Sequence, residues 1–269
     1  MIKINHIYKV FGAQEKAGLK MALEGASKLE VFKETGCTLG LIDVSFDINP
    51  SEIFVVMGLS GSGKSTLVRH INRLIEPSSG SISVSGADIL SLKQNEMIQL
   101  RRKKISMVFQ SFALLPHWTV IDNAAFGLYT QGLGKKEARE RAVPWLKAVG
   151  LQDYASQYPD ELSGGMRQRV GLARALAVDA EIILMDEAFS ALDPLIRCEM
   201  QDLLLTLQHQ LKKTIVFITH DIDEAIKLGA RIAILRDGAV VQVDTPRQMI
   251  DAPANSYVEQ FFKKHRAVI

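Results

Sequence analysis

The chain has 269 residues, of which 47% are hydrophobic and 23% charged, the balance of a folded globular protein. Its formal net charge of +2 is too small to indicate a nucleic-acid-binding surface. No apolar run approaches the roughly 18 residues that a membrane-spanning helix needs, so we expect no bilayer crossing by this chain alone. Cys37 and Cys198 lack metal-like spacing and are expected to be free thiols in a reducing compartment.

The N-terminal stretch alternates apolar and polar residues and predicts an edge strand, with Ile2, Ile4, Ile7 and then Phe11. Residues 13–40 resemble an insertion. Within it, residues 17–32 predict one surface helix with Leu19, Leu23 and Ala26 on the same face. Contact of this helix with a partner subunit is the alternative interpretation.

A phosphate-binding loop is the clearest motif of the chain. Residues 41–48 predict a strand with Val44, Phe46 and Ile48 facing inward, and residues 53–57 predict a fully buried strand. The next eight positions, 58–65, fit the pattern G-x-x-x-x-G-K-[ST], and after Thr66 a helical pattern follows at 67–75. Strand, glycine-rich turn and helix start are the context in which this pattern binds phosphate.

The residues expected to contact the nucleotide here are Gly58, Ser60, Gly61, Ser62, Gly63, Lys64, Ser65 and Thr66. Glycines let the loop close tightly and turn its backbone N–H groups toward an anion. Lys64 is placed to reach the β- and γ-phosphates, and Ser65 to hold Mg²⁺. A glycine-rich turn with an incidental lysine is the alternative.

The rest of the chain alternates predicted strands and helices, which indicates an α/β fold with a largely parallel sheet. Strands are expected at 81–85, 105–109, 181–185 and 214–219, a hairpin at 231–243, and helices at 135–149, 166–178, 195–211 and 222–228. Residues 111–159 form a helical insertion in this pattern. Gln110, Asp186 and His220 each follow a predicted strand, where such sheets bind ligands.

Two further stretches contain candidate catalytic or ligand-binding residues. Asp186 is placed to bind Mg²⁺, and Glu187 to act as general base on water, although an acidic pair that merely ends a strand is the alternative. Residues 162–169 form a second glycine turn at a helix start, where Ser163 can cap the helix and the helix end can face an anion. An ordinary helix cap is the alternative for that stretch.

Taken in order, these motifs resemble the nucleotide-binding subunit of an ATP-binding cassette (ABC) transporter. Residues 58–66 match Walker A, Gln110 the Q-loop, residues 162–169 the signature, residues 182–187 Walker B, residues 190–193 the D-loop and His220 the switch histidine. The resemblance implies a P-loop NTPase core with an antiparallel β subdomain and a helical subdomain. The implied single domain has its core and β subdomain at 1–110 and 160–269 and its helical subdomain at 111–159.

The family resemblance also implies a mechanism. Two copies pack head to tail and sandwich two ATP molecules with Mg²⁺. Each ATP lies between Walker A of one copy and the signature of the other (Ser163, Gly164, Gly165 and Gln168), with Asp193 at the interface. The implied metal ligands are Ser65, Gln110 and Asp186, and the implied catalytic residues are Lys64, Gln110, Glu187 and His220. Phe11, or else Tyr8, is expected to stack on adenine.

Residues 72–80, 107–117 and 185–197 resemble bacterial importers of glycine betaine, choline and related quaternary amines. The implied partners are a transmembrane permease, docked near residues 114–118, and indirectly a substrate-binding protein. The implied location is the cytoplasmic face of the bacterial inner membrane. Importers of other small solutes and non-transport ABC ATPases are the alternatives. Many members continue into a pair of cystathionine-β-synthase-type domains; this chain stops at Ile269, so we expect no such pair.

Overall fold

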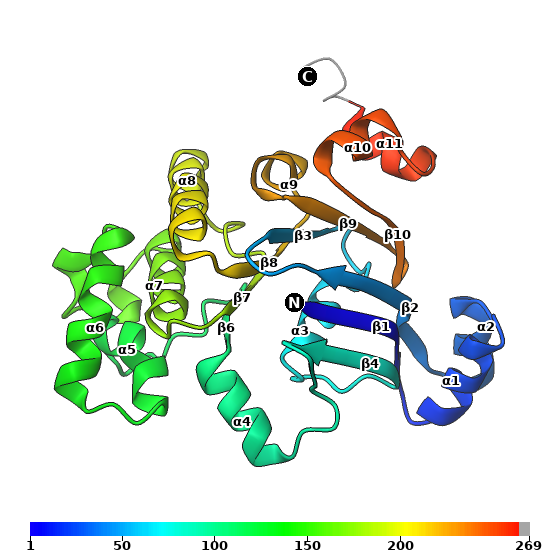
Figure 1. Cartoon of the computed structure of the whole chain (residues 1–269), viewed down its shortest axis with the longest axis horizontal. Helices are drawn as coiled ribbons and strands as arrows, with labels where there is room; N and C mark the ends of the chain where they lie inside the picture. The colour runs from blue at the N-terminus through cyan, green and yellow to red at the C-terminus, as the bar shows by residue number, and fades with distance from the viewer. Residues whose placement is uncertain (264–269) are drawn as a thin grey trace. The chain divides into compact units, whose positions relative to one another are not determined.

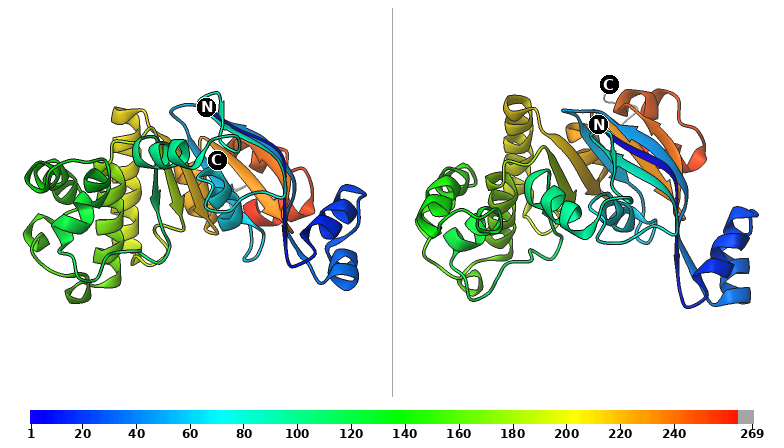
Figure 2. Two further views of the ribbon diagram at one scale, coloured as in Figure 1. Left: turned by 90° about the horizontal axis from the view of Figure 1, so that it is seen from below. Right: turned by 60° about the horizontal axis from the view of Figure 1, so that its bottom comes forward.

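The computed structural model describes residues 1–263. The described residues form two compact units, one containing residues 1–93 and 218–263, the other containing Gln94–Phe217. Figures 1 and 2 show the elements of each. Among the described helices, none has the length and apolar character needed to span a membrane.

The first unit contains two groups of strands with helices beside them. Its elements are β1 (Ile2–Phe11), α1 (Glu15–Leu23), α2 (Lys28–Thr35), β2 (Thr38–Ile48), β3 (Ile53–Met57), α3 (Lys64–Ile71), β4 (Ser79–Val84), β5 (Ala87–Asp88), α9 (Ile222–Leu228), β9 (Arg231–Arg236), β10 (Ala239–Asp244), α10 (Pro246–Asp251) and α11 (Ser256–Phe262).

The antiparallel sheet of this unit has the strand order β2-β1-β4-β5. The prediction that β1 is an edge strand was wrong, because β1 pairs with β2 on one side and β4 on the other. Ile2, Ile4 and Ile7 are fully buried, as the alternation predicted. The strand pattern shows which residues face inward, but it does not show that a later segment, β4, covers the second edge.

The insertion is a helical hairpin rather than the single predicted helix. Gly25 has φ +90°, which ends the first helix, and Ser27 starts the second with a capping box closed by Glu30. Leu23, predicted to share a face with Leu19 and Ala26, is 56% exposed because it lies at the end of α1, while Leu19 and Ala26 pack against the core of the insertion. In both views of Figure 2 the hairpin lies at one end of β1 and β2.

A small hydrophobic core holds this hairpin against the sheet. Its buried members are Val10, Ala22, Val31, Cys37 and Leu39, with Tyr8 and Leu19 packed against them. Close packing requires glycine here, since a Cβ on Gly12 would lie 2.7 Å from the sulfur of Cys37. The hairpin is therefore fixed to the strands rather than loosely attached.

The remaining strands of the first unit build the platform for the phosphate loop. β3 runs parallel to β9, and β9 and β10 form the predicted antiparallel hairpin. All five residues of β3 are buried. Phe54 of β3 stacks on Phe46 of β2 with ring centroids 5.0 Å apart, which joins the antiparallel sheet to the platform.

The second unit contains the helical insertion and further parallel strands. Its elements are α4 (Gln94–Lys103), β6 (Ile105–Val108), α5 (Val120–Thr130), α6 (Lys135–Ala148), the 3₁₀ turns η1 (Gln152–Tyr154) and η2 (Pro159–Glu161), α7 (Gly164–Ala177), β7 (Ile182–Asp186), α8 (Pro194–Leu211) and β8 (Thr214–Thr219), whose last two residues belong to the first unit. β6 runs parallel to β7. In Figure 1, α5 and α6 lie beside α7.

Candidate functional site

The phosphate loop joins β3 to α3, as predicted, and its closure depends on close packing at two glycines. A Cβ on Gly58 would lie 2.3 Å from the carbonyl oxygen of Leu235 in β9. Gly63 has φ +101°, and a Cβ there would lie 2.9 Å from the carbonyl oxygen of Gly40 in β2. Larger residues at these positions would push the loop off the strands that support it.

Lys64 lies inside the loop that it follows. Its side chain is buried, and its Nζ donates to the carbonyl oxygens of Gly58 and Leu59 at 2.8 and 2.9 Å. The turn between β9 and β10 also holds the loop, because the backbone N–H of Gly238 donates to the carbonyl oxygen of Ser62 at 3.0 Å. The ammonium group is thereby held at the start of α3, where the helix adds partial positive charge.

Ser62 provides the test of whether this loop fits a phosphate. Its Oγ is buried and has no hydrogen-bond partner among the described residues. A buried hydroxyl without a partner is unfavourable, and a phosphate oxygen in the loop would supply the missing acceptor. The loop therefore fits a nucleotide phosphate in both shape and hydrogen bonding.

An exposed aromatic ring lies beside this loop. Phe11, at the end of β1, is 41% exposed, with the Nζ of Lys9 5.3 Å from its ring centroid. A Cβ on Gly40 would lie 2.6 Å from Cε2 of Phe11, and Gly40 itself contacts the loop at Gly63. Tyr8 instead packs against the core of the insertion, and burial raises the pKa of its hydroxyl. Phe11 has the exposure that base stacking requires.

In the second unit, β7 ends at an acidic pair with two different environments. Asp186 is the last residue of the strand and is buried. Glu187 has a backbone φ of +47°, an uncommon conformation for a residue with a side chain. Its carboxylate accepts a hydrogen bond of 3.0 Å from the Nε2 of Gln110, which follows β6. The fold thus brings together two residues that lie 77 positions apart.

The backbone of Glu187 is also held by the segment after it. Its carbonyl oxygen accepts from the backbone N–H of Ser190 at 3.2 Å and from the Ser190 hydroxyl at 2.9 Å. Asp193 caps α8, accepting from the backbone N–H of Ile196 at 3.1 Å. This tight turn explains how the left-handed conformation of Glu187 is stabilised.

The second glycine turn begins α7 as predicted. Ser163 is exposed and caps the helix, its Oγ accepting from the backbone N–H of Met166 at 3.3 Å. Gly164 and Gly165 form the first turn. Gln168 is buried and donates to the carbonyl oxygen of Phe109 at 3.5 Å. Its side chain therefore links α7 to the end of β6, a role that the motif did not predict.

His220 lies in the turn between β8 and α9 and is exposed. Three hydrogen bonds hold this turn. The buried hydroxyl of Thr219 donates to Glu224 at 2.6 Å and accepts from the backbone N–H of Asp221 at 2.9 Å, and Asp221 caps α9 through the N–H of Asp223 at 2.8 Å. The first unit contains the phosphate loop, Phe11 and His220, and the second unit contains Gln110, the acidic pair and the signature turn.

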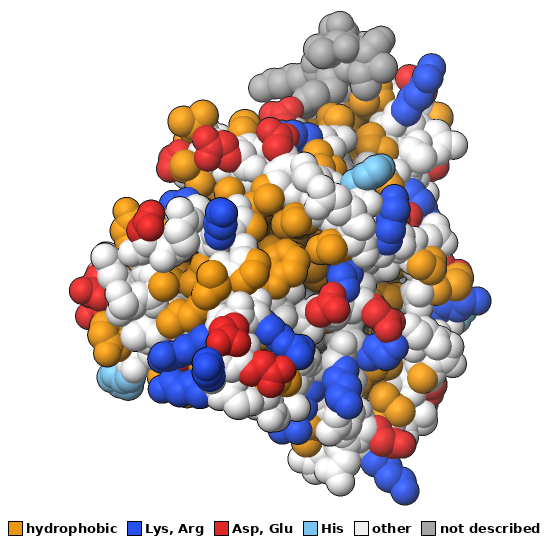
Figure 3. All heavy atoms as spheres, turned by 60° about the vertical axis from the view of Figure 1, so that its left-hand side comes forward, with side chains coloured by type: hydrophobic (Ala, Val, Ile, Leu, Met, Phe, Trp, Pro, Cys, Tyr) orange, Lys and Arg blue, Asp and Glu red, His pale blue; other side chains and the backbone are white. Residues whose placement is uncertain are grey.

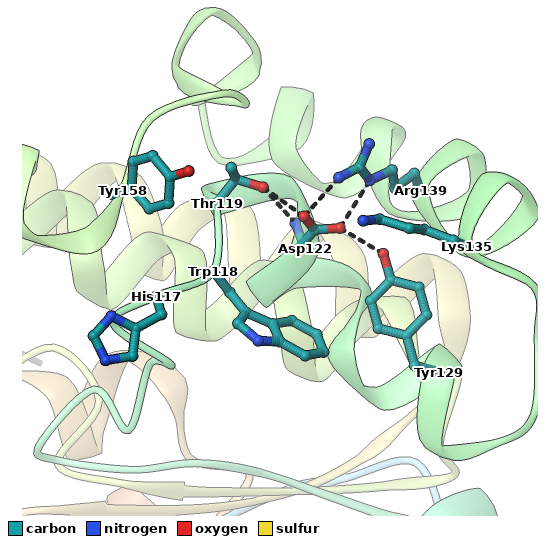
Figure 4. Close-up of a pocket in the computed structure, with 8 residues that line it drawn as sticks. All are labelled: His117, Trp118, Thr119, Asp122, Tyr129, Lys135, Arg139 and Tyr158. Carbon is teal, nitrogen blue, oxygen red and sulfur yellow. Dashed lines mark hydrogen bonds and ion pairs between the residues drawn. The ribbon is translucent and has the colours of Figure 1, made fainter.

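A pocket of about 600 Å³ opens in the helical part of the second unit (Figure 4). It is lined by His117, Trp118, Thr119, Asp122, Tyr129, Lys135, Arg139 and Tyr158. In Figure 4 the ion-pair network, with Tyr129, forms one end, and the rings of His117, Trp118 and Tyr158 lie toward the other. Residues 116–118 are exposed, whereas residues 114 and 115 are partly buried.

The network is centred on Asp122, whose carboxylate receives two hydrogen bonds from Arg139 at 2.8 and 2.6 Å. The hydroxyls of Tyr129 and Thr119 donate to it at 2.6 and 2.8 Å. The Arg139 hydrogen bonds hold the pKa of Asp122 well below its usual range, and burial together with Asp122 raises the pKa of Tyr129 to about 12. The network is thus charged and rigid at neutral pH.

The family profile described as ABC transporter matches residues 41–190. The chain belongs to the ABC transporter family. This ABC ATP-binding domain is 56% identical to the glycine betaine/proline betaine transport system ATP-binding protein ProV of Escherichia coli (strain K12), over 97% of this chain and 66% of ProV. It is 51% identical to the trimethylamine N-oxide transport system ATP-binding protein TmoW of Pelagibacter ubique, over 97% of this chain and 76% of TmoW.

Solved structures agree with the family assignment. The dimeric post-hydrolysis structure of the ATP-binding cassette MJ0796, bound to ADP and Pi, superposes with a TM-score of 0.79 at 33% identity, over 92% of this chain and 99% of MJ0796. The predicted α/β fold class of this ABC ATP-binding domain is confirmed. The chain spans about two thirds of the length of ProV.

The Asp122 network is the part of this ABC ATP-binding domain that the sequence analysis missed. Asp122 and Tyr129 are seven positions apart on α5, and Lys135 and Arg139 four apart on α6, so each pair shares a helix face. That spacing was visible in the sequence. The spacing alone did not indicate a site, because the two faces meet only when α5 packs against α6, and the sequence does not show that packing.

Proposed function

We propose that this chain is the ATP-hydrolysing, energy-coupling subunit of a bacterial importer for a quaternary amine such as glycine betaine or choline. The observation that carries the hydrolytic part is the hydrogen bond between Gln110 and Glu187, which holds a carboxylate directly after Walker B. A carboxylate fixed by a neutral amide remains able to accept a proton from water. A domain that only bound nucleotide would not need that arrangement.

The proposed roles follow from the residues of each unit. The backbone N–H groups around Gly61 and the ammonium of Lys64 bind the phosphates of ATP. Ser65, Gln110 and Asp186 would hold Mg²⁺, consistent with the preference of this ion for few carboxylates. In the described part of the chain, no three His, Cys, Asp or Glu residues gather at a metal-like site. When bound, the ion offsets negative charge that develops on the phosphates.

Adenine is proposed to stack on Phe11, since that ring is exposed and contacts the strand that supports the phosphate loop. His220 is proposed to contact the γ-phosphate. Its side chain is exposed, and the hydrogen-bonded turn of Thr219 and Asp221 fixes its backbone. We exclude Gln168 from the nucleotide contacts because its side chain is buried against Phe109.

Two copies of the chain are proposed to close head to tail around two ATP molecules. Ser163, Gly164 and Gly165 would complete the site of the other copy, and Asp193 would lie at the interface. In support, the capping serine is exposed at the start of α7, and a helix start is suited to an anion. The similar cassette MJ0796 is described as a dimer bound to ADP and Pi.

The substrate class is proposed from relatives. ProV is named for glycine betaine and proline betaine, OpuAA of Bacillus subtilis for glycine betaine at 54% identity, and TmoW for trimethylamine N-oxide. All three names describe small methylated amines. A separate binding protein and the permease would recognise the solute, and the chain would act at the cytoplasmic face of the inner membrane.

The permease is proposed to dock at the pocket of Figure 4. Trp118 is 37% exposed, and its ring packs edge-on against Phe126 and Tyr129 with centroids 5.9 and 5.6 Å away. A preformed aromatic surface next to a fixed ion pair suits a docking helix. Hydrophobic side chains also gather on the face shown in Figure 3, with basic and acidic side chains around them.

Lys135→Glu is expected to lower permease-stimulated ATP hydrolysis by about tenfold and to leave the basal rate of the isolated chain unchanged. Arg139 neutralises the charge of Asp122. The ammonium group of Lys135 therefore gives the pocket a positive charge, which suits an acidic docking segment. Lys147→Glu, also on α6 but outside the pocket lining, is the matched control and should behave like wild type. Equal losses in both variants would place the docking surface elsewhere.

The proposed substrate class can be tested by uptake. The chain would be co-expressed with the permease and binding-protein genes next to its own, and the complex placed in vesicles containing ATP and Mg²⁺. We expect ATP-dependent uptake of radiolabelled glycine betaine that choline or trimethylamine N-oxide inhibits. Uptake of an amino acid or Fe³⁺ with no betaine uptake would overturn the substrate class and leave the ATPase role intact.

A further inference from the structure

The loop after Gln110 has an unusual backbone. Phe112 and Ala113 both have positive φ, +58° and +48°. Two consecutive left-handed residues other than glycine are costly and persist only where the surrounding structure holds them. The loop is therefore not relaxed by itself, and some other element must maintain its conformation.

Arg174, on α7, supplies the required contacts. Its guanidinium donates to the carbonyl oxygen of Ala113 at 2.6 Å and to that of Phe112 at 3.0 Å. The side chain is 9% exposed, and burial lowers the pKa of the guanidinium. A buried cation is stable only with good hydrogen-bond partners, and here its partners are the two carbonyls that the left-handed backbone turns toward α7.

The signature end of the same helix contacts the same loop. A Cβ on Gly164 would lie 3.8 Å from the Cζ of Phe112, and the guanidinium of Arg167 lies 5.2 Å from the centroid of its ring. On the other side of Gln110, Gln168 donates to the carbonyl oxygen of Phe109. α7 thus holds the chain before and after Gln110, while its first turn carries the signature.

We propose that Arg174 is a positioning residue for ATP hydrolysis: it fixes the left-handed segment at Phe112 and Ala113 to the signature helix, and so keeps the amide of Gln110 on the carboxylate of Glu187. The loop and the signature serine then move as one body. This inference rests on the proposed role of Gln110. Arg174, which supports Gln110 in that role, lies outside all of the motifs named above.

The test is a double-mutant cycle on kcat with the full chain and Mg-ATP. Arg174→Met removes both donors while keeping an extended side chain, and is expected to lower kcat about tenfold, the effect of losing one or two hydrogen bonds from a charged group. The affinity for a fluorescent ATP analogue should not change, because the phosphate loop belongs to the other unit. In the Gln110→Ala background, Arg174→Met should lower kcat by less than about twofold.

Gln131→Leu is the matched control. Gln131 also donates to two carbonyl oxygens of the second unit, those of Arg102 at 2.7 Å and Val178 at 3.2 Å, but not in the loop. It is expected to lower the melting temperature without lowering kcat. If Arg174→Met folds poorly, Arg174→Lys serves in the same cycle, because a lysine cannot reproduce the planar two-donor geometry.

Two results would overturn the proposal. If the two single effects on kcat multiply in the double variant, Arg174 does not act through Gln110, and the proposed role of Gln110 is unaffected. If Gln110→Ala alone leaves kcat unchanged, the role of Gln110 and this inference both fail. A cycle in which the second change adds almost nothing supports both.

Discussion

Glu187→Gln is expected to lower the rate of ATP hydrolysis by about a hundredfold or more, the usual effect of removing a general base, and to leave ATP affinity nearly unchanged. A glutamine has the same size, and its amide oxygen can still accept the hydrogen bond from Gln110. It cannot accept a proton from water. ATP would then remain bound, and a nucleotide-dependent dimer should accumulate.

Single-turnover hydrolysis of labelled ATP measures the chemical step, and size-exclusion chromatography with ATP measures the dimer. Glu181→Gln is the matched control, since Glu181 precedes the same strand, β7, but forms an ion pair with Lys104. It should hydrolyse ATP at the normal rate and remain monomeric. Normal turnover by Glu187→Gln would show that another group activates the water.

The phosphate loop and the strands around it were predictable because their signals are local. A run such as 53–57, apolar at every position, indicates a buried strand whatever lies around it, and all five residues are indeed buried. The glycine pattern of the loop likewise reflects contacts with its own supporting strands. The position of Ser163 at the start of α7 followed from the preference of serine for helix N-caps.

Features that depend on distant segments were not predictable. The residues of β1 predict an edge strand because nothing in them reports the pairing with β4. The contact between Gln110 and Glu187 requires β6 to lie next to β7. The left-handed backbone of Phe112 and Ala113 is held by Arg174, which follows these residues by 62 and 61 positions in the chain. A non-glycine residue gives no local signal of positive φ.

Ser163→Arg is expected to reduce ATP hydrolysis to background while sparing nucleotide binding by a single chain. The residue is exposed and lies in the second unit, whereas the phosphate loop lies in the first, so a monomer should bind ATP normally. In the proposed dimer, a long cation would occupy the space between the signature and the γ-phosphate of the other copy. Equilibrium binding of a fluorescent ATP analogue and steady-state hydrolysis measure the two effects.

Thr245→Arg is the matched control for the loss of a helix cap. Thr245 caps α10 as Ser163 caps α7, each accepting a backbone N–H at 3.3 Å. Each variant should lose about 1 kcal/mol of stability, but only Ser163→Arg should lose hydrolysis. Loss of ATP binding by the Ser163→Arg monomer would contradict a role for Ser163 in the other copy.

The head-to-tail arrangement itself can be tested by mixing two variants that are both defective, each built on Glu187→Gln to trap dimers. Lys64→Ala removes the ammonium that lies in the phosphate loop, and Ser163→Arg blocks the signature. With ATP, each should remain monomeric alone. Their mixture should form dimers, because the loop of the Ser163→Arg chain meets an intact signature on the Lys64→Ala chain. If the mixture stays as monomeric as its components, the signature does not complete the site of a second copy.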